Sequence, residues 1–285
     1  MSMLLAENIQ VGYGSKIVIQ ELNLTIAPGQ ITTFIGANGC GKSTLLRTLA
    51  RLLKPTAGTV LLDGRDIFKR STREVAKQLA LLPQTPYAPP EVTVRQLVRL
   101  GRYPHGRWLG GWSDRDEQAV QEALAAMKLT DLADQPVDTL SGGQRQRAWI
   151  AMTLAQETDL LLLDEPTTYL DLSHQLDILD ILRELNRRHH KTIVMVLHDL
   201  NLAARYSDVM VAVHQGTVYT QGKPEKVMTP ETIRAIFDVE CVVIPDPVAG
   251  TPLCIPIATR NHEVGEDAGR TQEPAQARHA LELAR

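Results

Sequence analysis

The sequence has no long apolar run and no excess of positive charge. Its apolar runs, such as residues 160–163 and 193–197, are far shorter than the roughly 18–20 residues that span a bilayer. Residues 1–10 contain no basic segment followed by an apolar one, so no export signal is expected. We therefore expect a soluble chain whose membrane role, if any, comes through a partner. The formal net charge of −3 lacks the basic excess of nucleic-acid-binding proteins, and no nucleic-acid partner is expected.

Cysteine and aromatic residues are also scarce. The three cysteines, Cys40, Cys241 and Cys254, form no C-x-x-C pair, which fits a reducing cytosol and argues against a disulfide scaffold or a zinc site. Aromatic residues make up only 4% of the chain, so an aromatic side chain beside a motif carries more weight than usual. The 44% of hydrophobic and 22% of charged residues are ordinary values, and 285 residues suffice for one large domain or two smaller ones.

Short apolar segments alternate with helical patterns along the chain. Strands are predicted over residues 21–26, 31–35, 59–62, 80–82, 160–163, 192–197, 209–213 and 217–220. Helices are predicted over residues 43–53, 71–79, 94–100, 114–127, 142–156 and 172–185, with a loop over 101–113. The alternation predicts an α/β fold with a largely parallel sheet covered on both faces.

The spacing of these elements predicts one catalytic domain, residues 1–258, with an insertion and a tail. The core takes residues 1–84 and 158–258, and a helical subdomain takes residues 85–157. Residues 259–285 are polar, with few large apolar groups, and predict a disordered tail.

Residues 36–43, Gly-Ala-Asn-Gly-Cys-Gly-Lys-Ser, match the phosphate-binding pattern G-x-x-x-x-G-K-[ST] between a predicted strand and helix. The glycines let backbone N–H groups turn around phosphate oxygens, and the start of the helix adds its positive dipole end. Lys42 would reach the β- and γ-phosphates, and the Ser43 hydroxyl would bind Mg²⁺. A chance Gly-rich turn would give this pattern in only about 1% of such chains. The predicted ATP-binding residues here are Gly36, Asn38, Gly39, Cys40, Gly41, Lys42, Ser43 and Thr44, with Cys40 as a small space-filling residue.

A second motif is the apolar strand 160–163, which is followed by Asp164-Glu165-Pro166. Such a strand places its carboxylates at the edge of the sheet where ligands collect in α/β folds. Asp164 is predicted to hold Mg²⁺ through its water shell, and Glu165 to orient or deprotonate the attacking water. Taken alone, an apolar run before Asp-Glu is weak evidence, because an acidic pair at a helix start gives the same pattern.

The third motif is Leu-Ser-Gly-Gly-Gln at residues 140–144. Ser141 is a natural N-cap, so a simple capped helix would explain part of the motif. The pair Gly142-Gly143 is costly in a first helical turn and needs a further reason, which a second anion site at bare backbone would supply. Two phosphate-binding helix starts in one chain indicate two half-sites that a second copy completes.

Residues 140–144 resemble the signature of the ABC (ATP-binding cassette) ATPases and lie between the other two motifs, as that family requires. The resemblance covers residues 3–257 and implies a P-loop NTPase fold: a RecA-like core with a mostly parallel sheet, N-terminal antiparallel strands and an inserted helical subdomain. It implies that ATP–Mg²⁺ is bound between two copies and capped by Ser141, Gly142, Gly143 and Gln144.

The resemblance also implies roles for four single residues. Tyr13 would stack on adenine, although a turn tyrosine would look the same. Gln84 would report the γ-phosphate and contribute to the magnesium site. Asp171 would lie at the dimer seam, and His198 would contact the γ-phosphate, although a lone histidine at a strand end is more often structural. The implied catalytic set is Lys42, Gln84, Glu165 and His198.

A finer likeness links four segments to the ATPases of ferric-siderophore importers of the enterobactin and hydroxamate type. These segments are residues 102–105 (Arg-Tyr-Pro-His), Tyr169, residues 171–182 and residues 244–256. The likeness implies an ATP-hydrolysing homodimer on the cytoplasmic face of a bacterial inner membrane. Its partners would be a membrane permease and, indirectly, a periplasmic or lipoprotein siderophore-binding protein.

Three alternatives stay open at this point. Importers of haem, cobalamin or metal ions share much of the pattern. Soluble ABC switch ATPases of DNA repair or the ribosome usually carry two cassettes, coiled-coil insertions or basic patches, and none of these is visible here. A nucleotide-binding module without hydrolysis would require damaged catalytic residues, and none is evident.

Overall fold

A six-stranded sheet forms the centre of the computed structural model, which describes residues 3–106 and 111–259. The strand order is β10-β9-β3-β8-β7-β6, with β10 antiparallel at one edge and the other strands parallel. The bounds are β3 (Ile31–Ile35), β6 (Leu79–Leu82), β7 (Leu160–Leu163), β8 (Thr192–Val196), β9 (Val209–His214) and β10 (Thr217–Gly222). The predicted mostly parallel sheet is confirmed.

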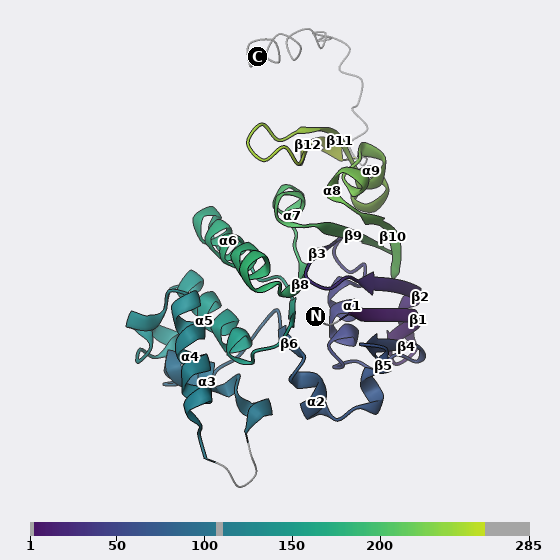
Figure 1. Cartoon of the computed structure of the whole chain (residues 1–285). Coiled ribbons are helices and arrows are strands. Elements are labelled where there is room, and N and C mark those ends of the chain that lie inside the picture. The colour runs from purple at the N-terminus through teal and green to yellow at the C-terminus, as the bar shows by residue number, and fades with distance from the viewer. Residues whose placement is uncertain (1–2, 107–110, 260–285) are drawn as a thin grey trace, which may run out of the picture.

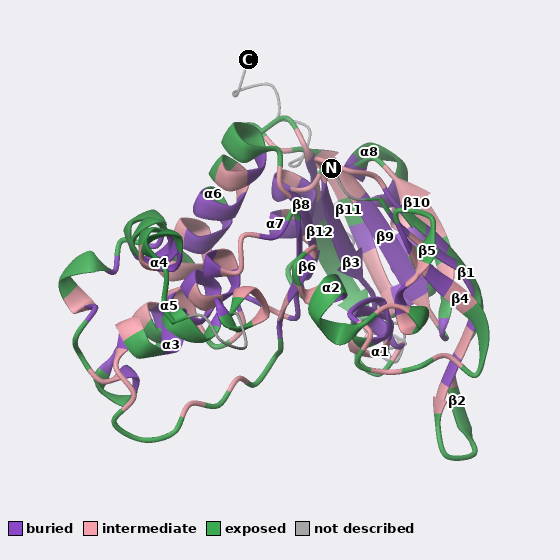
Figure 2. Cartoon of the chain, turned by 60° about the horizontal axis from the view of Figure 1, so that its bottom comes forward, coloured by how far each residue is buried: buried purple, intermediate pink, exposed green. Residues whose placement is uncertain are grey.

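Successive residues of the central strands enter two different hydrophobic cores. In β7, Leu160 and Leu162 belong to the same core as Phe34, whereas Leu161 and Leu163 belong to the core that contains Ile35. Figure 2 shows β3 and most of β9 in the purple of buried residues. Burial on both faces explains why β7 and β8 are continuous apolar runs without polar alternation.

A four-stranded antiparallel sheet, with the order β2-β1-β4-β5, covers one of these cores. Its strands are β1 (Leu4–Tyr13), β2 (Lys16–Ile26), β4 (Ala57–Leu62) and β5 (Arg65–Asp66). The helix α1 (Lys42–Leu49) shares this core, and 3-10 helix η1 (Ile67–Lys69) and helix α2 (Thr72–Ala76) follow (Figure 1). The predicted helix 43–53 ends early because Arg51 takes a left-handed backbone with φ of +64°. Ser71 and Glu74 form a capping box at the start of α2.

The second core extends into a group of helices on the other side of the molecule (Figure 1). Its elements are α3 (Val94–Leu100), η2 (Tyr103–His105), α4 (Asp114–Ala126), η3 (Thr130–Leu132), η4 (Val137–Thr139) and α5 (Gly142–Ala155). Helices α3, α4 and α5 each start at a hydroxyl residue in a complete capping box. The predicted loop over residues 101–113 is wrong in part, because η2 lies within it, and its residues 107–110 lie outside the described part of the chain.

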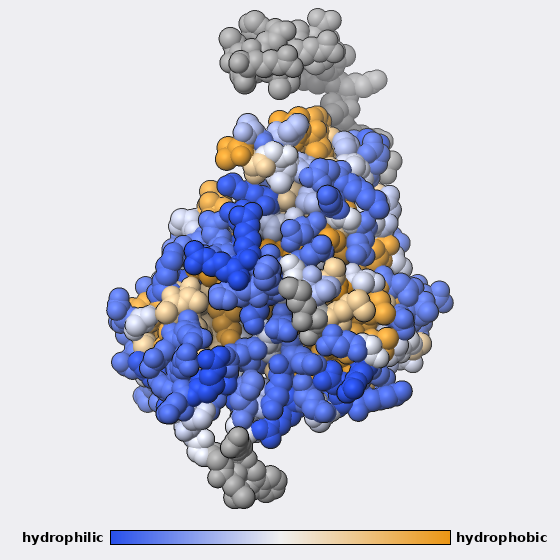
Figure 3. Space-filling view, in the orientation of Figure 1, coloured by the Kyte–Doolittle hydropathy of each residue, from blue (hydrophilic) through white to orange (hydrophobic). Residues whose placement is uncertain are grey.

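The C-terminal third adds helices and a hairpin. They are α6 (Leu172–His189), α7 (Leu200–Tyr206), α8 (Pro224–Val227), α9 (Pro230–Phe237), β11 (Val239–Pro245) and β12 (Pro252–Thr259). Figure 3 shows apolar side chains at the top of the molecule, where β11 and β12 expose Val242, Ile255 and Ile257. Of the predicted tail, Thr259 ends β12 and residues 260–285 lie outside the described range, so the domain division stays a prediction. Among the described helices, none combines the length and apolar character of a membrane span.

Arg102 ties α3, α4 and the end of α5 together from a buried position, with 4% of its surface exposed. Its Nε donates to Asp116 Oδ1 at 2.9 Å, and its Nη1 donates to Glu157 Oε2 at 2.6 Å and to the Ala155 carbonyl at 2.7 Å. Hydrogen bonds from Ser113 and Arg102 lower the pKa of Asp116 to about 2. This network accounts for the arginine of the Arg-Tyr-Pro-His segment.

Acid is expected to destabilise the chain through Asp116. Because its pKa is lower in the folded than in the unfolded state, its contribution is full above about pH 4 and is lost as the pH falls towards 2. The loss amounts to up to about 2 kcal/mol of the free energy of unfolding. Urea unfolding at a series of pH values between about 5 and 2.5, which lie on both sides of the unfolded pKa of 3.8, would measure this loss of stability. Asp116→Asn should flatten the pH dependence of the free energy of unfolding, and the exposed control Asp131→Asn should not. The same pH dependence in the wild type and both variants would contradict this role of Asp116.

Candidate nucleotide-binding site

Four parallel strands bring the predicted catalytic side chains to one edge of the central sheet. In the order β3-β8-β7-β6, each strand is followed at its carboxyl end by a predicted site residue or motif. The phosphate loop follows β3, His198 follows β8, Asp164 and Glu165 follow β7, and Gln84 follows β6. Because carboxyl ends of parallel strands share an edge, residues more than 160 positions apart meet there.

The phosphate loop, residues 36–41, connects β3 to α1 and wraps around the Lys42 side chain. The Nζ atom of Lys42 donates to the carbonyls of Gly36 at 2.7 Å and Ala37 at 3.0 Å. Gly36 is needed because a Cβ there would lie 2.3 Å from the Val213 carbonyl oxygen of β9. Lys42 is 4% exposed, so a phosphate entering the loop meets an ammonium group shielded from water. All the ATP-binding residues predicted here lie in this loop or in the first turn of α1: Gly36, Asn38, Gly39, Cys40, Gly41, Lys42, Ser43 and Thr44.

Ser43, in the first turn of α1, lies beside Asp164, which directly follows β7. The Ser43 hydroxyl donates to Asp164 Oδ1 at 2.9 Å, and Asp164 is only 2% exposed. Burial raises the pKa of Asp164, an effect that the Ser43 hydrogen bond opposes and the charge of Glu165 reinforces. A divalent cation would offset this cost, and hard oxygen atoms suit Mg²⁺, so the pair fits a magnesium ion. Gln84, the third predicted magnesium ligand, instead directs its amide nitrogen at Glu165.

Glu165 is the centre of a hydrogen-bond cluster. Its Oε1 lies 2.8 Å from His198 Nε2, and its Oε2 accepts from Gln84 Nε2 at 2.8 Å and from Thr168 Oγ1 at 3.0 Å. Burial works to raise the pKa of Glu165, but the hydrogen bonds from His198, Thr168 and Gln84 outweigh it and lower the pKa. An ionised carboxylate held in this way can orient a water molecule and accept its proton. Three of the predicted catalytic residues are therefore in direct contact.

Tyr13 and the signature residues lie on other elements, and the described contacts do not join them to the phosphate loop. Tyr13 ends β1 at the tip of the β1–β2 hairpin and is 50% exposed. Ser141 caps α5, with its hydroxyl accepting from the Gln144 N–H while the Gln144 side chain accepts from the Ser141 N–H. Ser141 and Gly142 are exposed and Gly143 is buried. This arrangement leaves the signature helix tip free to face another molecule.

Two residues that contact predicted site residues were themselves not predicted from the sequence. Thr168 holds Glu165 from three positions further on, a spacing that alone is too common to be noticed. His174 lies in the first turn of α6, with its Nδ1 2.7 Å from Asp171 Oδ1 and its ring against Gly143. The predicted seam residue Asp171 caps α6 through the His174 N–H, and these hydrogen bonds lower its pKa to about 2.

Comparison with known proteins identifies the family. The family model for the ABC transporter matches residues 19–168, which include the phosphate loop, the signature and the acidic strand end. The chain belongs to the ABC transporter family. It is therefore an ATP-binding subunit and an ATPase, and the predicted ABC ATPase fold is confirmed.

Relatives of this ABC protein are similar over nearly their whole length. "Probable siderophore transport system ATP-binding protein YusV" of Bacillus subtilis is 61% identical over 90% of this chain and 93% of its own. The ferric enterobactin transport ATP-binding protein FepC of Escherichia coli is 51% identical over 90% of this chain and 95% of its own. A dimeric structure of MJ0796, a bacterial ABC transporter cassette, superposes with a TM-score of 0.69 at 30% identity over 77% of this chain and 98% of that one.

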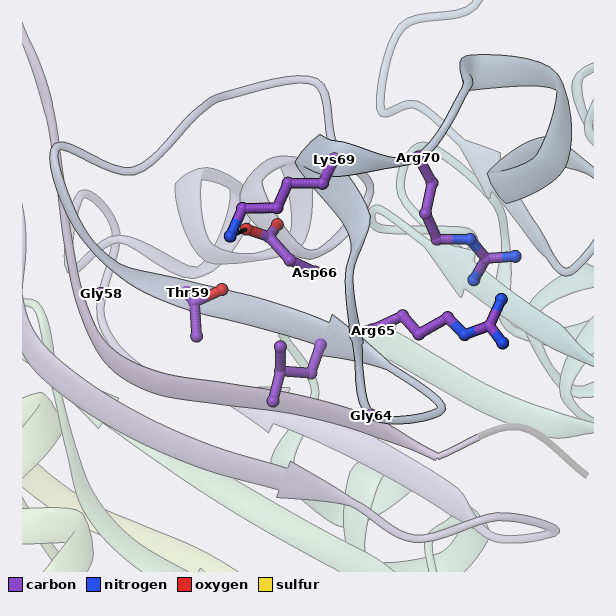
Figure 4. Close-up of a pocket in the computed structure, with 8 residues that line it drawn as sticks. Gly58, Thr59, Gly64, Arg65, Asp66, Lys69 and Arg70 are labelled. Carbon is purple, nitrogen blue, oxygen red and sulfur yellow. Dashed lines mark ion pairs between the residues drawn. The ribbon is translucent and has the colours of Figure 1, made fainter.

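A separate hollow of this ABC protein, with a volume of about 720 Å³, lies at the β4–β5 end of the antiparallel sheet (Figure 4). Arg65, Lys69 and Arg70 border it together with Asp66, whose carboxylate pairs with Lys69 at 3.8 Å. None of the predicted site residues lines it.

Proposed function

We propose that this ATPase drives the import of ferric siderophores across a bacterial inner membrane. The observation that supports the ATPase role most is that Lys42, Ser43, Asp164, Glu165 and His198 lie at one edge of the sheet. The signature residues 141–144 are all present at the separate start of α5. The names of the relatives in Bacillus subtilis and Escherichia coli, both of siderophore transport, support this cargo.

Two copies bind two ATP molecules between them in the proposed arrangement. The loop at residues 36–44 of one copy holds the triphosphate, and Ser141–Gln144 of the other copy covers it. Backbone N–H groups at both helix starts donate to phosphate oxygens, and the two helix dipoles stabilise the negative charge. Tyr13 stacks on the adenine, and Asp171 lies at the seam between the copies.

Hydrolysis then depends on residues already in contact. Glu165 accepts a proton from the attacking water, while His198 and Gln84 hold Glu165 and approach the γ-phosphate. Lys42 stabilises charge on the transferred phosphoryl group. Magnesium, held through Ser43 and Asp164, would supply further charge neutralisation. The shared contact of Gln84 and His198 with Glu165 lets the site sense whether phosphate is present.

A membrane permease is the proposed partner, and its docking surface lies around Gln84 and α3. This surface exposes three large side chains to solvent: Tyr87 is 80% exposed, Leu100 57% and Tyr103 87%. The neighbouring Arg102 is buried and hydrogen-bonded to Asp116 and the Ala155 carbonyl, next to the exposed Tyr103. The chain thus attaches to the cytoplasmic face of the inner membrane, and a periplasmic or lipoprotein binding protein delivers cargo to the permease.

Uptake measurements in a strain that lacks this chain test the cargo. We expect the strain to lose uptake of radioactive iron bound to enterobactin or to a hydroxamate, and wild-type protein to restore it. A Glu165→Gln protein expressed at the same level should not restore it. Loss of haem or cobalamin uptake, with ferric-siderophore uptake unchanged, would contradict the proposed cargo and leave the ATPase assignment intact.

A further inference from the structure

The tip of the signature helix α5 and the start of α6 lie side by side in one chain, and the His174 side chain joins them. One side of its imidazole contacts Asp171, the N-cap of α6. Its ring lies against Gly143 in the first turn of α5. His174 has no place in the nucleotide-site assignments made above.

The polar half of this contact is a hydrogen bond between the His174 ring and Asp171. Asp171 Oδ1 accepts the His174 backbone N–H at 2.9 Å and the Ser173 hydroxyl at 2.9 Å, and it lies 2.7 Å from His174 Nδ1. With a pKa of about 2, Asp171 is a carboxylate that can only accept hydrogen bonds. Nδ1 therefore carries the proton and donates it to Asp171.

The steric half of the contact explains the second signature glycine. A Cβ on Gly143 would lie 2.3 Å from His174 Cδ2, 2.7 Å from Cγ and 3.0 Å from Nε2. Atoms of carbon cannot approach so closely, so any larger residue at position 143 would have to displace the imidazole. In contrast, a Cβ on Gly142 would meet only Leu170 Cδ2, at 3.9 Å.

We propose that His174 is a positioning residue that holds Asp171 and the signature helix tip as one rigid unit. Both then reach the nucleotide bound to the second copy in a fixed relation. The inference rests on the proposed function, in which Ser141–Gln144 and Asp171 act on the nucleotide of the opposite copy. Histidine suits this task because it combines a flat ring for the glycine surface with a donor at Nδ1.

A merely structural role explains the contact less well. The N-cap of α6 is already made by the His174 N–H and the Ser173 hydroxyl, which do not depend on the imidazole. The His174 side chain is also 39% exposed and does not belong to either hydrophobic core. Removal of the ring should therefore change the geometry of the signature tip far more than the stability of the chain.

Substitutions at His174 separate the two halves of the contact. Alanine removes both, asparagine keeps a donor near the Nδ1 position, and phenylalanine keeps the ring. In the complex with the membrane subunit, His174→Ala should lower kcat about 10-fold to 100-fold, because small misplacements of positioning groups have such effects. The asparagine and phenylalanine variants should lie between alanine and wild type. ADP binding to the isolated chain should not change, because it uses residues 36–44 of the same chain.

His189→Ala is the matched control, since His189 is an exposed histidine at the other end of α6. It should keep the wild-type kcat. A His174→Ala enzyme with kcat within twofold of wild type would overturn the proposal. So would a joint loss of kcat and ADP binding, which would indicate general damage to the fold.

A double substitution tests the contact itself. Gly143→Ala should lower kcat by the clash with the imidazole, and adding His174→Ala should raise kcat above that of Gly143→Ala alone. A double variant no more active than Gly143→Ala would contradict the contact. If wild type hydrolyses ATP and Ser141→Arg does not, while His174→Ala behaves as wild type, the inference fails and the proposed function survives. A fully active Ser141→Arg enzyme would instead contradict the proposed arrangement of two copies, on which the inference rests.

Discussion

Replacing Glu165 with glutamine is expected to lower kcat for ATP hydrolysis by about 10²–10⁴-fold, the usual contribution of a general base. Glutamine is nearly the same size and keeps hydrogen-bonding groups near Gln84, Thr168 and His198, so the site should stay assembled. Its amide cannot accept the proton of the attacking water. ATP should therefore bind without being split, and two copies should stay closed around it. Single-turnover kinetics with magnesium, together with size-exclusion chromatography in ATP, would measure both effects.

The matched control for this experiment is Glu184→Gln on α6. Glu184 is exposed and pairs with the nearby Arg188 at 2.8 Å, so its loss should leave both kcat and dimer formation unchanged. A Glu165→Gln enzyme that turned over at the wild-type rate would contradict the role of Glu165 as proton acceptor. ATP-dependent dimers would in addition support binding of nucleotide between copies.

Replacing Ser141 with arginine is expected to abolish hydrolysis, although the substituted residue belongs to the opposite copy. Ser141 is exposed at the tip of α5, and an arginine there would occupy the space proposed for the phosphates. The variant should stay folded and bind ADP through its own loop. Its steady-state ATPase rate in the complex, its ADP affinity and its melting temperature would measure these outcomes.

Loss of the N-cap must be separated from the added bulk, because a cap contributes about 0.5–2 kcal/mol. Ser71→Arg provides the comparison, since Ser71 caps α2 through the same kind of capping box and is also exposed. It should lose a similar amount of stability and keep its ATPase activity. Equal activity in Ser71→Arg and Ser141→Arg would show that position 141 has no special place in the site.

Local patterns in the sequence predicted the central strands and the starts of α1 to α6 to within one residue, but not α7, α8 or α9. Residues 31–35 and 160–163 are fully buried strands, which their unbroken apolar character indicates. Helix ends were less predictable. The helix predicted over 172–185 continues to His189, because Asn186 is buried and bonds the carbonyls of Gly29 and Lys191, a tertiary contact.

Strands that depend on distant partners were harder to predict. The segments of β11 and β12 contain prolines and were noticed only as a resemblance, yet they pair from Val239 with Thr259 to Pro245 with Pro252. Their prolines are tolerated because the hairpin forms a sheet of two strands, both of which are edge strands. No strand was predicted over β1, whose register with β2 is broken by irregularities between Ala6 and Gly12.

Residue types in the site were predictable, but their contacts were not. The phosphate loop and the acidic strand end each have a pattern tied to their chemistry. In contrast, the cluster of Gln84, Thr168 and His198 around Glu165 joins three separate segments, and no spacing along the chain indicates it. The ring of His174 against Gly143 joins residues of two helices in the same way.

The most direct measurement of ATP binding between two copies is a mixture of two inactive variants. Ser141→Arg keeps its phosphate loop and Lys42→Ala keeps its signature tip, so each alone should be inactive in the complex. A mixed dimer would contain one intact site, and random pairing should restore roughly a quarter of the wild-type ATPase rate. A mixture that stays as inactive as its two components, with subunit exchange verified by differently tagged chains, would contradict the account.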